Sequence, residues 1–205
     1  RPDRYDTDGD GYGDGDELER GSDPRDPASG IYRGGWPYNP SRDAPRGDPG
    51  DHAEIGRPFL RAALVDQHGD AVDLYDFADD GAPVVIQVAG MWCAPCIQLG
   101  ELLSGRPSEL DAYVGAAEAV REGRVWWLTV LAQDEDGAPA DADDAARWAA
   151  RFDVPQVPVL VDDGTVWPYA SPGGALPSVW RLDAGFVVQD GGAEDARVLA
   201  FVDTL

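Results

Sequence analysis

The sequence predicts an α/β fold in which a central sheet is flanked by helices, with extra strands and an acidic arm at its N-terminal end. Two observations support this prediction. From residue 52 onward, apolar runs typical of buried strands alternate with segments of helical periodicity, and turn residues rich in Gly, Pro and Asp separate them. After a first hairpin, the expected order of elements is β–α–β–α–β–β–α.

The hairpin and a buried strand come first. Residues 62–65 and 71–74 flank a polar turn at residues 67–70, and this pattern predicts a hairpin. The unbroken apolar run at residues 83–89 predicts a strand that is buried on both faces.

Two helical stretches should follow this strand. The first begins within residues 94–96, and Pro107 should end or kink it. Its inward-facing positions are Ile97, Leu99, Leu102 and Leu103. Ser108 can cap the second stretch, which runs to about Arg121, and Gly123 is suited to its C-terminal end.

The remaining elements complete the predicted order. Asp141 or Asp143 should open a helix that buries one apolar face. That face consists of Ala145, Trp148, Ala149 and Phe152. The other predicted elements are strands at 125–131 and 157–161, a hairpin formed by 179–182 and 186–188, and a helix at 193–205.

Composition divides the chain into three segments. Residues 1–30 are acidic and rich in glycine, and we interpret them as a calcium-binding repeat. Residues 31–51 are rich in proline and glycine and favour a linker or extended arm, part of which docks through Trp36 and Tyr38. Residues 52–205 are expected to form the globular domain.

The chain is strongly acidic, with a net charge of −23 and no lysine. The acidity is spread along its length, since residues 1–51 carry 13 acidic residues against 7 arginines, and residues 52–205 carry 26 against 9. Nucleic acid is disfavoured as a partner, because phosphate binding needs a basic surface. The sequence has no apolar run of about 18 residues, so it predicts no membrane span. It opens at Arg1 rather than methionine, so we expect a processed or trimmed form.

The only two cysteines lie in the segment Trp92-Cys93-Ala94-Pro95-Cys96, directly after the predicted buried strand. A strand that leads into a C-x-x-C at the start of a helix is suited to thiol–disulfide exchange. The partial positive charge at the helix N-terminus favours the thiolate of the first cysteine, which we expect to be exposed. There the thiol pKa falls from about 8.5 to roughly 3.5–7.5. The second cysteine can then resolve a mixed disulfide.

These residues resemble the W-C-x-P-C segment of the thioredoxin superfamily. A second match lies at residues 173–183, which resemble that family's cis-proline segment and the strand that follows it. The resemblance implies a thioredoxin-like fold with a central mixed sheet. It also implies that Pro177 is the cis-proline and that Leu176 offers backbone groups to an extended substrate. The added N-terminal strands and central insertion are similar to the redoxin/TlpA-type branch, which is mostly extracytoplasmic.

The resemblance gives each residue of the motif a role. Cys93 would be the nucleophile, Cys96 the resolving thiol, Trp92 a shield over the pair, and Pro95 a stiffener of the first helical turn. Two alternatives are a structural disulfide, which would stabilise little across so short a loop, and a metal site. Only His52 and His68 could add histidine ligands to such a site.

Three positions depart from the family pattern. Gln87 stands where thioredoxins carry a buried acid, and it cannot accept a proton as a base. Ile97 replaces the basic residue that often follows the second cysteine. Gly90 stands where a peroxiredoxin needs threonine, which disfavours the alternative of a thiol peroxidase. Since Ala94 and Pro95 include no histidine, a reductase or isomerase of protein disulfides is favoured over a strong oxidant. Its protein substrate and its electron donor are not identified by the sequence.

A second motif at residues 6–17 matches a twelve-residue calcium loop. Gly11 would make the sharp turn. The expected oxygen ligands are Asp6, Asp8, Asp10, the Tyr12 carbonyl, Asp14 and a bidentate Glu17. Carboxylate oxygens in a flexible loop suit Ca²⁺ better than Mg²⁺, which demands octahedral geometry. The alternative is an acidic tether with no specific metal.

The run from Asp14 to Asp26 resembles a thrombospondin type 3-like repeat, a spacer that calcium stiffens. A calcium site of millimolar affinity suits the periplasm or the cell surface. Two functions of different class therefore stay open. The first is an extracytoplasmic thiol–disulfide oxidoreductase on a calcium-stabilised arm. The second is a calcium-dependent surface module with a vestigial thioredoxin domain.

Overall fold

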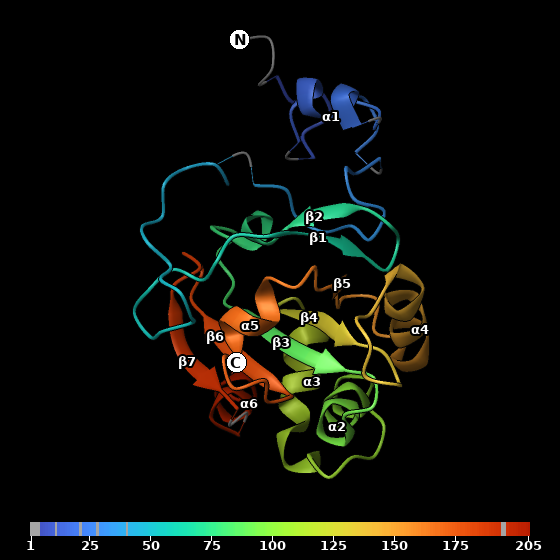
Figure 1. Ribbon diagram of the computed structural model, residues 1–205. Helices are drawn as coiled ribbons and strands as arrows, with labels where there is room; N and C mark the ends of the chain where they lie inside the picture. The colour runs from blue at the N-terminus through green and yellow to red at the C-terminus, as the bar shows by residue number, and fades with distance from the viewer. Residues whose placement is uncertain (1–4, 11, 21, 28, 40, 194–195) are drawn as a thin grey trace.

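The computed structural model describes residues 5–10, 12–20, 22–27, 29–39, 41–193 and 196–205. The described residues form a seven-stranded sheet flanked by helices, with the N-terminal arm beyond the β2–β1 edge (Figure 1). The strands of this part of the chain are β1 Ala63–Asp66, β2 Ala71–Asp73, β3 Val84–Gly90, β4 Trp126–Gln133, β5 Val159–Val161, β6 Ser178–Leu182 and β7 Val188–Gly192. Its helices are α1 Asp14–Arg20, α2 Ala94–Leu103, α3 Val114–Arg121, α4 Ala142–Phe152, α5 Val166–Ala170 and α6 Ala196–Val202.

The sheet is mixed, with the strand order β2-β1-β5-β4-β3-β6-β7. Strands β3, β4 and β5 are parallel, whereas β1 pairs antiparallel with β5 and β6 pairs antiparallel with β3. All residues of β3 are buried, because the strand lies in the middle of the sheet and is covered on both faces. The carboxyl ends of the three parallel strands therefore lie at one edge of the sheet, and β3 leads there into the C-x-x-C segment.

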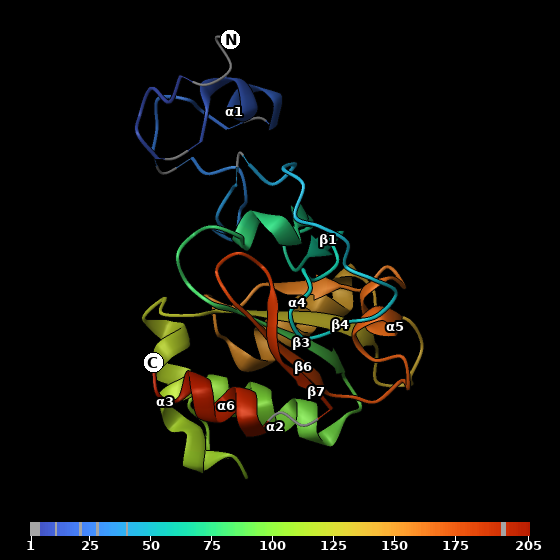
Figure 2. The ribbon, with the colours of Figure 1, turned by 90° about the vertical axis from the view of Figure 1, so that its left-hand side faces the viewer.

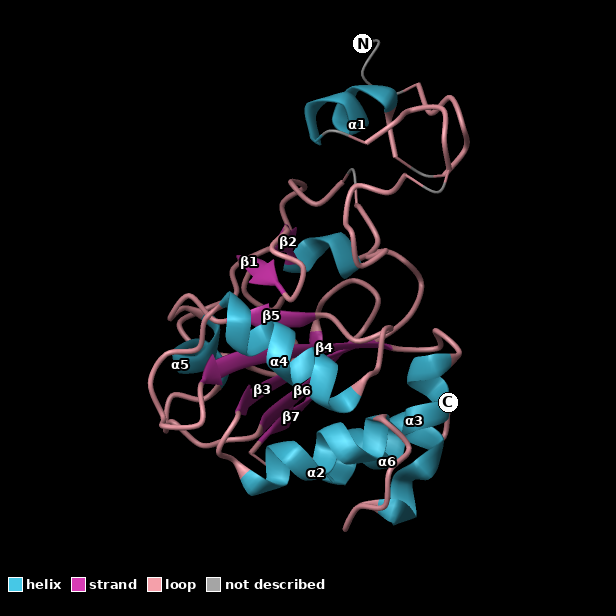
Figure 3. Cartoon of the chain, turned by 90° about the vertical axis from the view of Figure 1, so that its right-hand side faces the viewer, coloured by secondary structure: helices cyan, strands magenta, loops and turns pink. Residues whose placement is uncertain are grey.

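Helices α2, α3, α4 and α6 cover one face of the sheet, while α5 and the segment before β1 cover the other (Figures 2 and 3). Alternate side chains of β3 point to opposite faces. Val85 belongs to a buried cluster that contains residues of α2, α3 and α6, whereas Ile86 belongs to the cluster on the other face, which contains Trp36 and Tyr169. Two apolar layers thus enclose the strand that carries the cysteine motif.

The predicted α/β fold is confirmed, and most predicted elements lie where the sequence places them. The hairpin forms as β1 and β2, the buried strand forms as β3, and α2 begins at Ala94 as expected. Asp141 caps α4 reciprocally: its carboxylate accepts from the Asp144 N–H, and the Asp144 carboxylate accepts from the Asp141 N–H. Gly123 follows α3 with a φ of 68°, which is the left-handed conformation predicted for it.

Two helix boundaries were predicted wrongly. Helix α2 ends at Leu103, before Pro107 is reached, because Gly105 adopts a φ of 73° and closes the helix end with its own N–H. The next helical stretch starts with a 3-10 turn at Asp111–Tyr113 and continues as α3 from Val114, so it begins later than directly after Ser108. The Ser108 hydroxyl instead accepts a local hydrogen bond in the preceding loop.

The C-terminal third differs in detail from the prediction. The hairpin turn extends through Phe186, which has a φ of 66°, so β7 occupies Val188–Gly192 instead of 186–188. The described part of the last helix ends at Val202 rather than Leu205. Helix α5 was not predicted, because Pro168 looks like a helix breaker, yet proline is tolerated in a first turn. Within the described residues, no helix has the length and apolarity that crossing a membrane requires.

The segment before β1 is closely packed against the sheet domain. Trp36 is 1% exposed, and its indole N–H donates to Asp66 at 2.7 Å. The Asn39 side-chain amide donates to the carbonyls of Tyr75 and Ala78. The predicted docking of Trp36 is thus confirmed, while the domain boundaries after residues 30 and 51 stay predictions.

Candidate active site

Cys93 and Cys96 form a disulfide at the N-terminus of α2, with their Cα atoms 5.2 Å apart. Cys93 is the N-cap residue of this helix, and its sulfur accepts from the Cys96 N–H at 3.3 Å. Pro95 lies in the first turn, where its missing N–H removes no helical hydrogen bond. The sequence therefore places the first sulfur against a helix amide, as expected.

Cys93 is not exposed, contrary to the prediction. Its residue is 2% exposed and Cys96 is fully buried. Both lie in an apolar cluster with residues of β3, β4 and α4, against which Leu176 also packs. The reason is tertiary: the motif follows a strand buried on both faces, and the loop that contains Leu176 lies against it.

The Leu176–Pro177 peptide bond is cis, as the resemblance implies. The loop that carries it approaches the C-x-x-C segment closely at Gly90. A Cβ atom at Gly90 would lie 3.1 Å from Leu176 Cδ1 and 3.2 Å from Trp92 Nε1. The absence of a side chain at Gly90 thus lets both Leu176 and Trp92 approach the end of β3 closely.

Trp92, the residue before Cys93, is exposed and held by a hydrogen bond. Its residue is 53% exposed, and its indole N–H donates to Gln133 Oε1 at 3.0 Å. The amide nitrogen of Gln133 donates in turn to the Gly137 carbonyl at 2.7 Å. Gln133 ends β4, so the end of one parallel strand orients the tryptophan that follows another.

Gln87 lies in the buried layer beneath α2. Its side-chain oxygen accepts from the Trp127 indole N–H at 3.0 Å, and its Nε2 has no hydrogen-bond partner among the described residues. Because an amide does not titrate, Gln87 is polar but cannot act as a buried proton acceptor for the cysteines.

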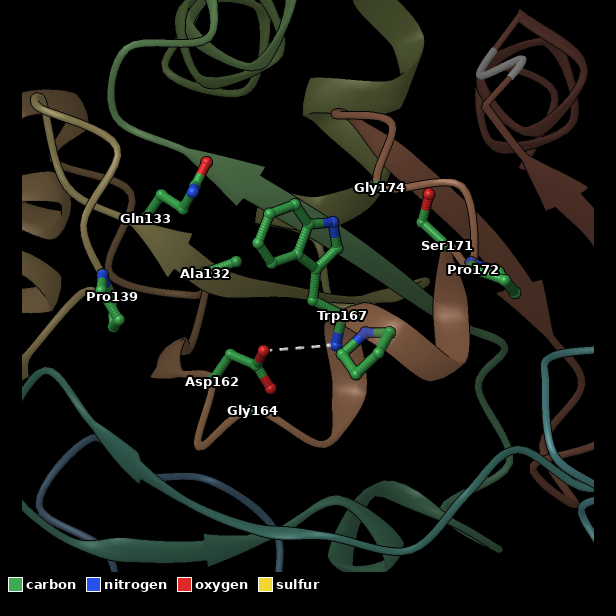
Figure 4. Close-up of a pocket in the computed structure, with 10 residues that line it drawn as sticks. Ala132, Gln133, Pro139, Asp162, Gly164, Trp167, Ser171, Pro172 and Gly174 are labelled. Atoms are coloured by element: carbon green, nitrogen blue, oxygen red, sulfur yellow. Dashed lines mark hydrogen bonds between the residues drawn. The ribbon is translucent and has the colours of Figure 1, made fainter.

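A pocket of about 410 Å³ opens beside the cysteine segment (Figure 4). Its walls come from the end of β4, from the loop after β5, from α5 and from the loop that leads to the cis-proline. The lining residues are Ala132, Gln133, Pro139, Asp162, Gly164, Trp167, Pro168, Ser171, Pro172 and Gly174. Sequence reasoning missed this pocket, and the signal that could have indicated it is Asp162, an acid directly after a parallel strand.

Asp162 is the one acidic residue among those that line the pocket. Its carboxylate accepts from the backbone N–H groups of Val166 and Trp167, so it caps the start of α5. Burial raises the pKa of this carboxyl, and the backbone hydrogen bonds oppose that rise in part.

The second predicted site, the acidic loop, is only partly assembled. Carboxylate oxygens of Asp6, Asp8 and Asp10 lie within 4.8 Å of one another. Asp14 does not join this group; both of its oxygens accept from Thr7, at 2.8 Å and 2.7 Å. The Tyr12 N–H donates to Asp10. Gly11, the predicted sharp turn, lies outside the described residues.

Glu17 is fully buried although it lies in the short helix α1. One of its oxygens accepts from the Ser22 hydroxyl at 3.3 Å, and the other has no partner among the described residues. One oxygen of Asp8 and one of Asp10 are buried and unpartnered in the same way. Burial raises the pKa of Glu17, and the nearby carboxylates of Asp10 and Asp8 raise it further.

Comparison with solved structures identifies the fold. The chain is similar to a candidate protein disulfide isomerase from Bacteroides thetaiotaomicron, at a TM-score of 0.54 and 14% identity over 74% of this chain and 87% of the other. It is similar to a secreted disulfide oxidoreductase from Mycobacterium tuberculosis homologous to E. coli DsbE, at a TM-score of 0.50 and 16% identity over 70% and 96%. A candidate thiol:disulfide interchange protein DsbE from Chlorobium tepidum matches at a TM-score of 0.50 and 18% identity over 73% and 97%.

No protein-family model matches the chain, and no curated protein matches it. The similarity to solved structures therefore concerns the fold, and this fold is thioredoxin-like.

Proposed function

We propose that this protein is a thiol–disulfide oxidoreductase that acts on protein disulfides through Cys93 and Cys96. The observation that carries the proposal is the disulfide itself, placed at the N-terminus of α2 with the Cys93 sulfur on the Cys96 N–H. The cis bond before Pro177 and the contact of Leu176 with the cysteine cluster support it. The names of the structural neighbours point to the same chemistry.

The reaction begins from the reduced pair. The Cys93 thiolate attacks one sulfur of the substrate disulfide, forming a mixed disulfide and releasing one substrate thiolate. The Cys96 thiolate then attacks the Cys93 sulfur, closing the Cys93–Cys96 disulfide and releasing the second substrate thiolate. Two electrons pass from the protein dithiol to the substrate, and a dithiol electron donor must restore the pair. Leu176 offers its backbone to the substrate, while Trp92, Pro95 and Pro177 keep the pair in place.

Reduction or isomerisation is the favoured direction, because no histidine lies between the cysteines. Proton transfer has no buried acid to use at Gln87, so stabilisation of the Cys93 thiolate depends on the helix amides. We place the protein outside the cytoplasm, in the periplasm or at the cell surface. A secreted structural neighbour and the acidic loop support this location.

Two cysteine variants test the proposal. The reduced protein should reduce insulin disulfides, Cys93→Ser should abolish this activity, and Cys96→Ser should accumulate a mixed disulfide that mass spectrometry detects. Retention of full activity by Cys93→Ser would refute the mechanism. A cysteine pair that cannot be reduced and reoxidised would favour the calcium-dependent surface module, and rapid peroxide consumption at Cys93 would favour a thiol peroxidase.

A specific observation favours a second role for the N-terminal loop, and we propose that it binds one structural Ca²⁺. Within the described part of the chain, the fully buried Glu17 has one oxygen without a hydrogen-bond partner, and so do Asp8 and Asp10. A buried carboxylate without a partner is costly, and a hard cation held by oxygen ligands would remove that cost. Asp6 and the Tyr12 carbonyl would complete the set. Asp14 would contribute through a water or only through its bonds to Thr7.

Calorimetric titration of the chelator-treated full chain with calcium chloride tests this role. We expect one site in the millimolar range or tighter, with magnesium binding more weakly. Absence of any calcium-dependent heat or shift in melting temperature would leave the loop an acidic tether.

A further inference from the structure

The pocket and the disulfide lie at the same edge of the sheet. Strands β3, β4 and β5 are parallel, so their carboxyl ends meet there. The cysteine segment follows β3, and the pocket lies beyond the ends of β4 and β5. In open α/β sheets, ligands bind outside the carboxyl ends of parallel strands. The pocket is therefore placed to bind part of a substrate whose disulfide reaches Cys93.

A hydrogen bond and a short length of chain connect the pocket with the surroundings of the disulfide. Gln133 lines the pocket and accepts the indole N–H of Trp92. Gly174 lines the pocket as well, and Leu176, two residues further, packs against the cysteine cluster. Two residues of extended chain span at most about 7 Å. A peptide that lies along Leu176 thus passes the pocket within a few residues of its reacting cysteine.

The walls of the pocket are mostly apolar. They include the indole of Trp167 and the rings of Pro139, Pro168 and Pro172, and Figure 4 shows this indole among the lining residues. The Asp162 carboxylate is already engaged by backbone N–H groups. A volume of about 410 Å³ is within the range of small-molecule sites, roughly 300–1,000 Å³. The pocket has room for one large side chain.

The charge around the pocket discriminates between occupants. None of the residues given as its lining is basic. The chain that connects Gln133 with Pro139 contains Asp134, Glu135 and Asp136, of which Glu135 pairs with Arg147 at 3.3 Å. Another acid, Asp163, follows Asp162. Acidic side chains would be repelled from this rim, whereas apolar side chains with neutral or basic neighbours would not.

We propose that this pocket is a substrate subsite that receives an aromatic or long aliphatic side chain lying within a few residues of the substrate's reacting cysteine. The subsite rests on the proposed oxidoreductase function and specifies its substrate: an extended polypeptide segment with a large apolar residue, and without acidic residues, near the disulfide. The occupant is thus a side chain of the substrate protein, held while Cys93 attacks.

A series of peptides tests the subsite. Each peptide carries one cysteine in a disulfide with thionitrobenzoate and one variable residue two positions from it on either side, which is Phe, Leu, Ala or Glu. The reduced full-length protein is mixed with each peptide, and release of the coloured thiolate gives the rate constant. We expect the Phe and Leu peptides to react at least about tenfold faster than the Ala peptide, with the Glu peptide slowest.

Ala132→Leu should fill the pocket from the end of β4 and reduce this preference to about twofold or less. The matched control is Ala117→Leu, which places the same substitution beside a cavity of about 360 Å³ near the far end of α2. The control should keep the preference. Ser171→Leu, which fills the pocket from the residue that follows α5, replaces Ala132→Leu if the latter fails to fold. Ala117→Leu should also react with dithiobis(nitrobenzoate) as fast as the wild-type protein does, which shows that the control keeps a reactive cysteine pair.

The outcomes separate the subsite from the oxidoreductase proposal. Equal rates for all peptides, with normal reduction of dithiobis(nitrobenzoate), would overturn the subsite and leave the oxidoreductase function in place. If the reduced protein reacts with no disulfide at all, the oxidoreductase function fails. The subsite is then decided by fluorescence anisotropy with labelled, cysteine-free peptides: tighter binding of the Phe peptide that Ala132→Leu abolishes supports it, and equal binding overturns it.

Discussion

The acidic loop at residues 6–17 and the docked segment at residues 31–42 are in contact through Tyr12 and Trp36. They differ in whether the buried carboxylate in each region has hydrogen-bond and charge partners. The docked segment provides the partners of Asp76, a residue that is 1% exposed. The Asp76 carboxylate accepts from the Tyr32 hydroxyl, the Asn39 N–H and the Arg42 guanidinium. The acidic loop buries Glu17 just as deeply and leaves one of its oxygens without a partner among the described residues.

This difference indicates what each region needs in order to be stable. A buried carboxylate is tolerated when an ion pair and hydrogen bonds satisfy it, and it is costly when they do not. The docked segment supplies its own donors and cation, so we expect it to fold without any ligand. Residues 6–17 of the acidic loop contain no arginine or lysine that could pair with its carboxylates, so we expect the loop to depend on calcium. Tyr12 joins the two regions, since its hydroxyl donates to the Trp36 carbonyl at 2.8 Å.

The largest effect should come from removing the apolar anchor of the docked segment. Trp36→Ala deletes an indole that is 1% exposed and leaves Asp66 without one of its donors, so it should lower the free energy of unfolding by about 3–5 kcal/mol. Urea unfolding in the presence of a chelator measures it. Leu18→Ala, at a residue that is 70% exposed, is the control and should change stability by no more than about 0.5 kcal/mol. Equal values for the two variants would make residues 31–51 a true linker.

The next effect concerns the buried ion pair. Asp76→Asn leaves the Arg42 guanidinium, whose side chain is 15% exposed, without its counter-charge and should cost about 3 kcal/mol of stability. The matched control is Asp70→Asn, which breaks a pair with Arg33, a side chain that is 64% exposed, and should cost about 1 kcal/mol or less. Thermal unfolding of both variants measures the difference. A control as costly as Asp76→Asn would contradict the importance of burial.

Calcium should produce a smaller effect that is confined to the acidic loop. At a free calcium concentration ten times the dissociation constant, the wild-type protein should gain about 1.4 kcal/mol of stability. Glu17→Gln should lose most of this gain, yet in chelator it should be at least as stable as wild type, because it no longer buries an unpaired charge. Glu19→Gln, at an exposed position of the same helix, should respond to calcium as wild type does. A full calcium response in Glu17→Gln would remove Glu17 from the site.

The smallest effect concerns Asp162, a carboxylate that is buried in a third way, and the pH dependence of its contribution to stability. Asp162 accepts from backbone N–H groups and has no ion pair among the residues that the structure describes, and burial raises its pKa. At pH values between the ordinary and the raised pKa, Asp162 therefore binds more protons in the folded protein than in the unfolded chain. Its contribution to stability is present at low pH and is lost as the pH rises through the raised pKa. The stability of wild type relative to Asp162→Asn should fall over that range, by about 1 kcal/mol or less. Urea unfolding across this pH range tests it, and a constant difference would contradict the expected role of burial.

The fold could be predicted from the sequence because its central elements have strong local signals. The strand β3 is a continuous apolar run, α2 starts at a cysteine N-cap followed by proline, and α4 is capped by Asp141. Boundaries were missed where a local backbone feature decided them. Gly105 ended α2 before Pro107 could, and α5 formed in spite of Pro168.

The candidate site could be predicted only in part. The pairing of Cys93 with Cys96 and the cis bond before Pro177 matched short motifs. The burial of Cys93 and the contact of Trp92 with Gln133 did not, because they join segments that are far apart in the sequence. The pocket has the same origin, since no single segment contains more than a few of its lining residues.

By itself, the sequence determined the order of strands and helices, the cysteine pair at a helix start and the spacing of acids in the N-terminal loop, because each depends on residues that are neighbours along the chain. Only the tertiary structure decided which charges are buried, which of them are paired, and what lies beside the disulfide. Glu17 and Asp76 are both acids in the sequence, and they differ only in the donors and cations that the folded chain brings to them. The partners of Asp76 are Tyr32, Asn39 and Arg42, which are distant from it in the sequence, so tertiary packing sets their distances.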